Sequence, residues 1–223
     1  MTMICAPIFE KNMENIPGIA REYIVRGADI LELRIDAIKN PSKSMIRKLA
    51  SDIQFPFIAT NRLAMEGGLF KGSEKERIEF LLAVASEAEY VDIELQTKRE
   101  ELEKILEFPV KTIISYHNFN ETPPINRLSK IIKEEKKLGD LAKIAVMPQT
   151  IKDTLTILQL LSNEDNLIAI SMGELGKYTR IIAALFGSPI TYASGGISTA
   201  PGQLDIEKTR QIIEELKPEE KTP

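Results

Sequence analysis

The sequence predicts an α/β protein built as a single (β/α)8 TIM barrel, and three observations lead to this prediction. Eight short runs rich in β-branched and aliphatic residues alternate with segments of amphipathic helical spacing along the 223 residues. The repeat suits strand–helix–strand units, and no linker or break in composition divides the chain. The first turn, FEKNMENIPG, is not the glycine-rich phosphate loop that an open doubly wound sheet usually carries.

The predicted strands follow one another along the whole chain. They cover residues 3–9, 30–36, 56–62, 90–95, 111–118, 141–148, 166–173 and 190–196. Start signals mark several of the eight helices expected to accompany them. Ser73 with Glu76 forms a capping box, and Pro41 and Pro123 mark two further helix starts. We expect one domain over residues 1–223, with a polar, frayed tail from about residue 217.

Composition and charge limit the partners. Hydrophobic residues make up 43% of the chain and charged residues 28%, as in ordinary soluble domains. The net charge of −4 argues against nucleic acid, since phosphate binding needs a basic surface. The sequence contains neither a run of about 20 apolar residues nor a basic flank before the first apolar run, which argues against a membrane span and a signal peptide. The single cysteine, Cys5, cannot form an internal disulfide, so we expect a cytoplasmic location.

Alternation within the strands predicts charged side chains inside the barrel. In residues 30–36, apolar side chains share one face of the strand, while Glu32, Arg34 and Asp36 share the other. The apolar face should pack on the helices, so the charged face points inward. The same pattern places further polar side chains inside, namely Asp92, Glu94, Ser115, His117 and Lys143. Buried charges need partners or a ligand, so this interior is either an ion-pair network or a functional site.

Lys143 and His117 point most directly to chemistry. Lys143 comes early in its strand, so its amine should lie deep in the barrel, where burial and cations such as Arg34 favour the neutral form. A neutral amine is the nucleophile of Schiff-base chemistry, but an ion pair with Glu32 or Glu94 fits the position equally well. His117, the one histidine, ends its strand on the catalytic face of such barrels, where it could carry protons or complete the core.

The single histidine also argues against one class of barrel enzyme. Binuclear metal hydrolases draw on several histidines, so we expect no metal site. Carboxylates alone could bind Mg²⁺, but nothing in the sequence requires it.

Several segments together resemble the type I 3-dehydroquinate dehydratase family, the Schiff-base-forming enzymes of the shikimate pathway. In the family's order they are ELRID (32–36), NRLAMEGG (61–68), VDIEL (91–95), SYHNF (115–119), AKIAVMP (142–148), SMGELGKYTR (171–180) and STAPGQ (198–203). Each lies at the end of a predicted strand or just after it. The resemblance implies a (β/α)8 barrel that forms a homodimer and needs no metal or organic cofactor.

The resemblance also implies roles for individual residues. Lys143 would form an imine with the ketone of 3-dehydroquinate. His117 would move the protons that release water and 3-dehydroshikimate, and Glu66 would orient His117. The implied substrate-binding residues are Glu32, Arg34, Arg62, Arg180, Thr199 and Gln203. Arg180 suits the substrate carboxylate best, because its planar donors match that group.

The last matching segment and two other positions depart from the family's usual sequence. Thr199 stands where serine is more common, which keeps the hydroxyl but adds a methyl group. Asn118 follows His117 where an acidic residue is common, and Cys5 lies where some relatives have serine. The glycines of residues 195–203 still favour a lid that closes over the ligand.

Two other functions fit part of the sequence. A class I aldolase or transaldolase would share the buried lysine, although many of these bind sugar phosphates near the last two strands, where this chain has Arg180. A non-catalytic binding barrel need not keep Lys143 and His117 together, yet both are present. Activity on a sugar phosphate would support the aldolase, and the absence of any activity or trapped adduct would support the binding protein.

Overall fold

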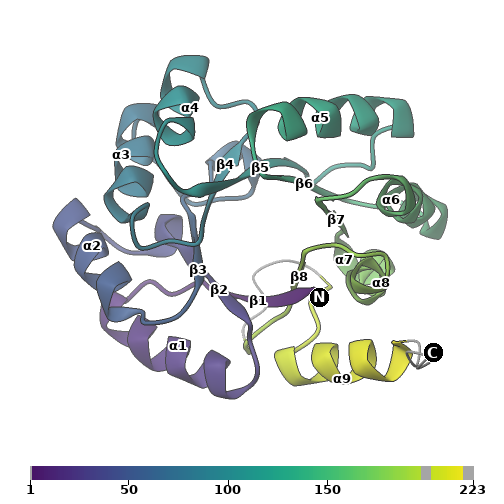
Figure 1. The fold of residues 1–223 in the computed structure, drawn as a ribbon, viewed down its shortest axis with the longest axis horizontal. Coiled ribbons are helices and arrows are strands. Elements are labelled where there is room, and N and C mark those ends of the chain that lie inside the picture. Colours follow the sequence, from purple (N-terminus) through teal and green to yellow (C-terminus); the bar gives the residue numbers. More distant parts are fainter. Residues whose placement is uncertain (1, 197–201, 218–223) are drawn as a thin grey trace, which may run out of the picture.

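Eight parallel strands form the centre of the computed structural model, which describes residues 2–196 and 202–217 (Figure 1). The strands are β1 (Met3–Ile8), β2 (Ile30–Arg34), β3 (Phe57–Thr60), β4 (Tyr90–Glu94), β5 (Lys111–Asn118), β6 (Leu141–Val146), β7 (Leu167–Ser171) and β8 (Ile190–Tyr192). They pair in chain order from β1 to β7, and β8 pairs with β1. Within the described residues no ladder joins β7 to β8, so the barrel is nearly closed. The predicted (β/α)8 barrel is confirmed.

Helices surround the strands on the outside (Figure 1). They are α1 (Ile16–Val25), α2 (Lys43–Asp52), α3 (Glu74–Val84), α4 (Arg99–Leu106), α5 (Ile125–Leu138), α6 (Ile151–Asn163), α8 (Thr179–Leu185) and α9 (Ile206–Leu216). Short turns that the sequence analysis did not predict are α7 (Gly173–Gly176) and the 3-10 turns η1 (Met13–Asn15), η2 (Ile35–Ala37) and η3 (Ala64–Glu66). Three of these turns, η2, η3 and α7, follow the carboxyl ends of β2, β3 and β7.

The predicted helix starts are confirmed. Ser73 Oγ accepts a hydrogen bond from the Glu76 backbone N–H at 3.3 Å, and the Glu76 carboxylate accepts one from the Ser73 backbone N–H at 2.9 Å. α2 begins after the cap Ser42, and α5 begins after Pro124. The predicted strand over 190–196 is too long, because after Tyr192 the chain turns to pair with residues 204–206.

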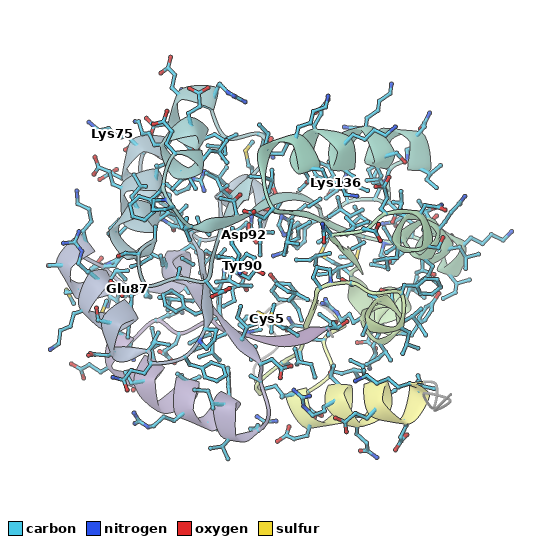
Figure 2. The ribbon with its side chains drawn as sticks, in the orientation of Figure 1. Cys5, Lys75, Glu87, Tyr90, Asp92 and Lys136 are labelled. Carbon is cyan, nitrogen blue, oxygen red and sulfur yellow. The ribbon has the colours of Figure 1, made fainter. Side chains whose placement is uncertain are left out.

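Two successive layers of the barrel interior, counted from the amino ends of the strands, differ in character. The lower layer, at the amino ends of the strands, is apolar and consists of Cys5, Ile30, Ile58, Tyr90, Ile113, Leu141, Ile168 and Ile190. Two positions later along the strands lies the upper layer, which is largely polar and includes Glu32, Asp92, Ser115, Lys143 and Tyr192. Figure 2 shows Cys5, Tyr90 and Asp92 near the centre, and Lys75, Glu87 and Lys136 among the surrounding helices. The predicted inward direction is confirmed for Glu32, Asp92 and Lys143, but Asp36 lies in η2, beyond the end of β2.

Two further expectations from the sequence concern a membrane-spanning helix and the polar C-terminal tail. In the described part of the chain, no helix combines the length and the apolar composition needed to cross a membrane. The expected polar tail lies almost entirely in residues 218–223, outside the described residues. A single domain over residues 1–223 stays a prediction.

Candidate active site

The carboxyl ends of the strands surround one pocket that contains most of the residues named from the sequence. Its lining includes Glu32, Arg34, Arg62, Glu66, His117, Lys143, Arg180 and Gln203. Thr199 lies outside the described residues. Pro7, Ala145, Ile170, Met172 and Tyr192 complete the wall, together with Gly67 and Phe119. The pocket therefore has a charged side, formed mainly by β2 to β6, and a more apolar side next to β7 and β8.

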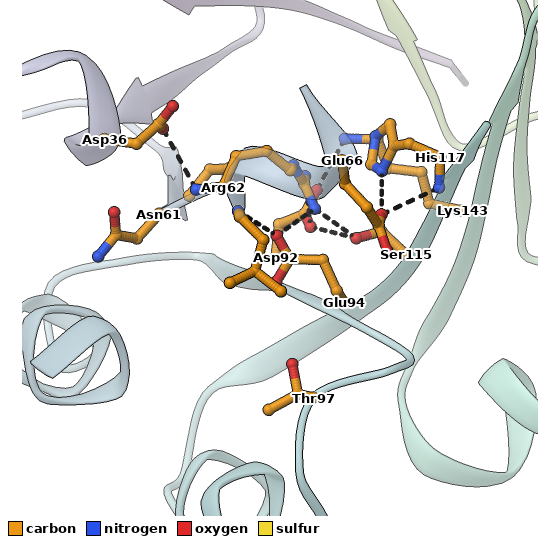
Figure 3. Close-up of polar contacts among 12 residues, drawn as sticks. Asp36, Asn61, Arg62, Glu66, Asp92, Glu94, Thr97, Ser115, His117 and Lys143 are labelled. Atoms are coloured by element: carbon orange, nitrogen blue, oxygen red, sulfur yellow. Dashed lines mark hydrogen bonds and ion pairs between the residues drawn. The ribbon is translucent and has the colours of Figure 1, made fainter. Parts of the chain in front are cut away.

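Lys143 lies at the bottom of the pocket, and only 4% of its surface is exposed. Its Nζ donates to Asp92 Oδ2 at 2.7 Å (Figure 3). It also donates to the Tyr192 hydroxyl at 2.9 Å. Glu32 Oε1 is farther away, at 3.8 Å. The lysine has an ion-pair partner, and the closest one is Asp92 rather than Glu32 or Glu94.

Asp92 joins Lys143 to a second cation. Its Oδ1 lies 2.7 Å from Arg62 Nη2 and accepts a hydrogen bond of 2.7 Å from Ser115 Oγ (Figure 3). Burial alone would raise the pKa of Asp92, but the charges of Arg62 and Lys143 hold it well below its usual range. Asp92 is therefore a permanent anion that compensates both buried cations.

The charge network continues outward from Arg62. Arg62 Nη1 lies 3.1 Å from Glu94 Oε1, and Glu94 Oε2 lies 2.6 Å from Arg77 Nη1. Arg77 is fully buried on α3, and its Nη2 lies 2.8 Å from Glu74 Oε1, where the network ends. Each charge of this network thus has an opposite charge beside it, which a low-dielectric interior requires. Arg62 lines the pocket while its nitrogens already hold Asp92, Glu94 and Ser115.

His117 and Glu66 form a pair at the rim of the pocket. Glu66 Oε2 lies 2.8 Å from His117 Nδ1 and accepts the His117 backbone N–H at 3.0 Å (Figure 3). Gln96 Nε2 donates to the other carboxylate oxygen of Glu66. When the Glu66 carboxylate is ionised, it fixes the proton of the neutral imidazole on Nδ1 and leaves Nε2 able to accept a proton.

Burial shifts the proton affinity of both partners. It lowers the pKa of His117 well below its ordinary 6.5, and the charges of Arg62 and Lys143 lower it further. Burial raises the pKa of Glu66 to about 7, although Arg62 opposes this shift. At neutral pH the imidazole is therefore uncharged, which is the state that a general base needs.

A tight turn brings Glu66 to the histidine. The NRLAMEGG segment folds back in η3, where the Gly68 backbone N–H donates to Leu63 O at 2.9 Å. A Cβ at Gly68 would lie only 1.9 Å from Arg62 O, so only glycine fits this return of the chain. The glycines of the motif thus place Arg62 and Glu66 on the same side of the pocket.

A second tight turn places Arg180. A Cβ at Gly176 would lie 2.1 Å from Ser171 O, so α7 packs directly on the end of β7. Thr179 Oγ1 donates to Gly176 O at 2.6 Å, and Thr191 Oγ1 donates to Arg180 O at 2.8 Å. Arg180 is 3% exposed, and burial lowers its pKa to about 10. It stays cationic at neutral pH and suits an anionic group of a ligand.

The remaining predicted residues are also anchored. Glu32 Oε1 accepts a hydrogen bond from Thr60 Oγ1 at 2.9 Å. Arg34 donates to both oxygens of Asp36, at 2.9 and 2.8 Å, and its guanidinium carbon lies 5.1 Å from the centre of the Phe9 ring. These contacts fix the direction in which each side chain meets a ligand.

Sequence reasoning gave no role to several residues that contact the site. Asp92 and Ser115 were assigned to the inner face by alternation, but without a partner. Tyr192 shares a strand face with Ile190, and this spacing could have identified it. Gln96 follows a strand in a turn, where no periodic signal exists. Among the described residues, no group of three or more His, Cys, Asp or Glu side chains could hold a metal ion.

The fold and pocket define a (β/α)8-barrel protein with a candidate catalytic site at the carboxyl ends of its strands. A family model described as type I 3-dehydroquinase matches residues 4–220. The chain is 54% identical over 219 residues to the 3-dehydroquinate dehydratase of Methanothermobacter thermautotrophicus, covering 98% of this chain and 99% of that one. It is 50% identical over 212 residues to the enzyme of that name from Methanobrevibacter smithii, covering 95% of each chain. The chain belongs to the type I 3-dehydroquinase family.

Solved structures agree with this assignment. The fold is similar to a type I 3-dehydroquinate dehydratase from Clostridium difficile, crystallised with covalently modified comenic acid. That match has a TM-score of 0.87 at 29% identity and covers 96% of this chain and 92% of the other. The 3-dehydroquinate dehydratase from Aquifex aeolicus matches with a TM-score of 0.85 at 31% identity, over 97% of this chain and 100% of the other.

Proposed function

We propose that this member of the family dehydrates 3-dehydroquinate to 3-dehydroshikimate, a step of the shikimate pathway, through a Schiff base on Lys143. The observation that carries the proposal is the position of Lys143 in one pocket with the His117–Glu66 pair and the cationic Arg180. The names of the relatives support the substrate and the hydro-lyase reaction. The family match also favours dehydration over aldol cleavage and over a non-catalytic barrel.

In the proposed mechanism, the Lys143 ammonium group gives up one proton and its Nζ attacks the ketone carbon of the substrate. The ketone oxygen leaves as water with this proton and one further proton from the amine, which leaves a protonated imine. The imine cation withdraws electrons and acidifies the neighbouring CH₂ group. His117 Nε2 removes a proton from this carbon, and the resulting enamine expels the hydroxyl group one carbon farther on. The hydroxyl leaves as water with the proton held by His117, and hydrolysis of the imine releases the product and the free amine.

The neutral state of His117 supports its role as the base. Burial keeps its pKa low, so it is unprotonated at neutral pH before the substrate CH₂ is attacked. Glu66 orients the ring and stabilises the imidazolium that forms, because an ionised carboxylate then faces the new charge.

Substrate binding uses the charged rim. We assign the carboxylate of the substrate to Arg180 and its ring hydroxyls to Glu32 and Arg34. Arg62 contributes from below, since it lines the pocket while holding Asp92. Gln203 lines the pocket from the segment after β8, and a role in substrate binding for Thr199, which lies outside the described residues, stays a prediction.

We also propose that the protein acts as a cytoplasmic homodimer without metal or organic cofactor. The single cysteine supports a reducing compartment. The resemblance to the family supports the homodimer and the cofactor-free chemistry, because a lysine imine supplies the electron sink that a cofactor would otherwise provide.

The direct test is the rate at which the conjugated enone product appears when the protein is mixed with 3-dehydroquinate. We expect rapid product formation by the wild type and a fall of at least about 1,000-fold in Lys143→Ala and His117→Ala. Lys136→Ala is the matched control, because Lys136 also pairs with a carboxylate, Glu164 at 2.6 Å, but lies on α5 outside the barrel. Absence of product from the wild type would contradict the proposal.

A further inference from the structure

Tyr192 contacts the reacting atom of the site from the apolar side. Its hydroxyl lies 2.9 Å from Lys143 Nζ, and the same nitrogen lies 4.3 Å from the centre of its ring. Tyr192 is buried on β8 and lines the pocket. Asp92 holds the nitrogen from the opposite, charged side at 2.7 Å. The lysine nitrogen therefore lies between an anion and an aromatic ring that carries a hydroxyl group.

The two contacts of Lys143 differ in chemistry. Asp92 supplies a full negative charge, which stabilises the ammonium form before the reaction as well as the imine during it. The tyrosine supplies a neutral hydroxyl, because burial raises the pKa of Tyr192 well above its ordinary 10. A neutral hydroxyl can accept from the protonated amine and donate to the unprotonated amine. Tyr192 thus keeps a contact with the nitrogen in both protonation states.

We propose that Tyr192 is a further catalytic residue, whose hydroxyl holds Lys143 Nζ for attack and whose ring face stabilises the positive charge of the protonated imine. The inference rests on the proposed function, since it requires an imine on Lys143. A cation within about 6 Å of an aromatic ring centre is stabilised by the ring, most strongly where water is excluded. The protonated imine remains cationic but has one N–H donor, whereas the ammonium group has three. The ring therefore contributes a larger share of the stabilisation of the cation after the imine forms than before.

Tyr90 provides a matched comparison within the same interior. It belongs to the lower layer, on β4, and is 9% exposed. The cation above its ring is Lys111 at 5.4 Å, on the opposite end of the barrel from the pocket. Removing the hydroxyl of Tyr90 therefore removes the same atom from the same kind of buried ring, without contact with the reacting nitrogen.

The test compares Tyr192→Phe, Tyr192→Leu and Tyr90→Phe with the wild type. To measure the rate of imine formation, each protein is mixed with 3-dehydroquinate and quenched with borohydride at successive times, and the adduct is quantified by mass spectrometry. The values of kcat and KM are measured in parallel. We expect Tyr192→Phe to slow adduct formation and kcat about tenfold with little change in KM, because it loses one hydrogen bond to a charged group. Tyr192→Leu should lose about 100-fold, and Tyr90→Phe should match the wild type.

Tyr192→Phe tests the role of the hydroxyl group even if Tyr192→Leu fails to fold, because phenylalanine keeps the volume of the ring. An adduct rate and a kcat within twofold of the wild type in Tyr192→Phe would overturn the role of the hydroxyl. A tenfold loss in Tyr90→Phe as well would overturn the assignment to Tyr192, since any buried hydroxyl would then matter. A wild type that forms product but no adduct would instead overturn the imine on Lys143, and this inference with it.

Discussion

The two layers of the barrel interior differ by only two positions along each strand, yet they have opposite character. On β2 the step runs from Ile30 to Glu32, and on β6 from Leu141 to Lys143. The lower layer is apolar and closes the barrel, whereas the upper layer is charged and opens into the pocket. One layer therefore supplies stability and the other chemistry. The apolar layer also excludes water from beneath the charges, so the ion pairs of the upper layer lie in a medium of low dielectric constant.

Asp92→Asn should damage both the chemistry and the stability of the upper layer, because it leaves Lys143 and Arg62 without their shared anion. We expect kcat to fall about 100-fold and the free energy of unfolding to fall by about 3 kcal/mol. Steady-state kinetics and urea unfolding measure both effects. Glu89→Gln is the control, since it breaks an exposed pair with Lys111 and should change neither quantity much. An Asp92→Asn variant that keeps its kcat within twofold would show that the anion is not needed.

Glu66→Gln should change the pH dependence of the upper layer as well as the rate. In the wild type, Glu66 takes up a proton as the pH falls through its pKa of about 7, so kcat/KM should fall on the acid side with a midpoint near pH 7. Glutamine does not titrate, so the remaining acid limb belongs to His117, whose pKa burial lowers. We expect kcat at pH 8 to fall about tenfold and the acid limb to move to lower pH. An unchanged acid limb would assign it to another group.

Ile30→Ala should show the reverse pattern, because Ile30 belongs to the lower layer and is fully buried. The cavity should lower the free energy of unfolding by about 3 kcal/mol, with kcat unchanged under conditions where the protein stays folded. Thermal or urea unfolding, followed by kinetics well below the transition, separates the two quantities. A large loss of kcat at full folding would show that the layers are not independent.

Glu135, a buried carboxyl group outside the ring of strands, tests how much the pairing of buried charges contributes to stability. Glu135 on α5 is fully buried, and neither of its carboxylate oxygens makes a well-formed hydrogen bond within the described residues. Burial raises its pKa well above 4.5, and the charges of Glu66 and Asp92 raise it further. Above the pKa of the unfolded chain, wild-type stability should therefore fall as the pH rises.

We expect Glu135→Gln to match the wild type near pH 4 and to be more stable by at least about 1 kcal/mol at pH 8. The measurement is urea unfolding across this pH range. A stability difference that does not depend on pH would mean that Glu135 ionises as easily in the folded protein as in the unfolded chain.

The sequence alone predicted the features whose signals lie within one segment of the chain, and it missed those that depend on contacts between segments. Strand alternation is local, so it correctly placed Glu32, Asp92 and Lys143 inside the barrel. The partner of Lys143 depends on the stagger between strands, which a single sequence does not reveal, so Asp92 was not identified as that partner. The α7 turn depends on close packing of Gly176 against Ser171, and helical periodicity cannot detect a turn of this length.

The position of Glu66 shows the same limit. It lies in a 3-10 turn after β3, outside any periodic element, and only the resemblance to the family singled it out. Tyr192 was within reach of the alternation argument, but its importance appears only when Lys143 reaches it across the barrel. Gln96 lies in a turn after β4 and contacts Glu66 only because two turns meet at the rim.

The central claim, that Lys143 forms the imine, is tested most directly by trapping it. The wild type is incubated with 3-dehydroquinate and reduced with borohydride, and the modified peptide is identified by mass. We predict one stable adduct, on the peptide that contains Lys143, with none in Lys143→Ala and an undiminished amount in Lys136→Ala. An active protein that yields no adduct, or yields one on a different lysine, would contradict the account.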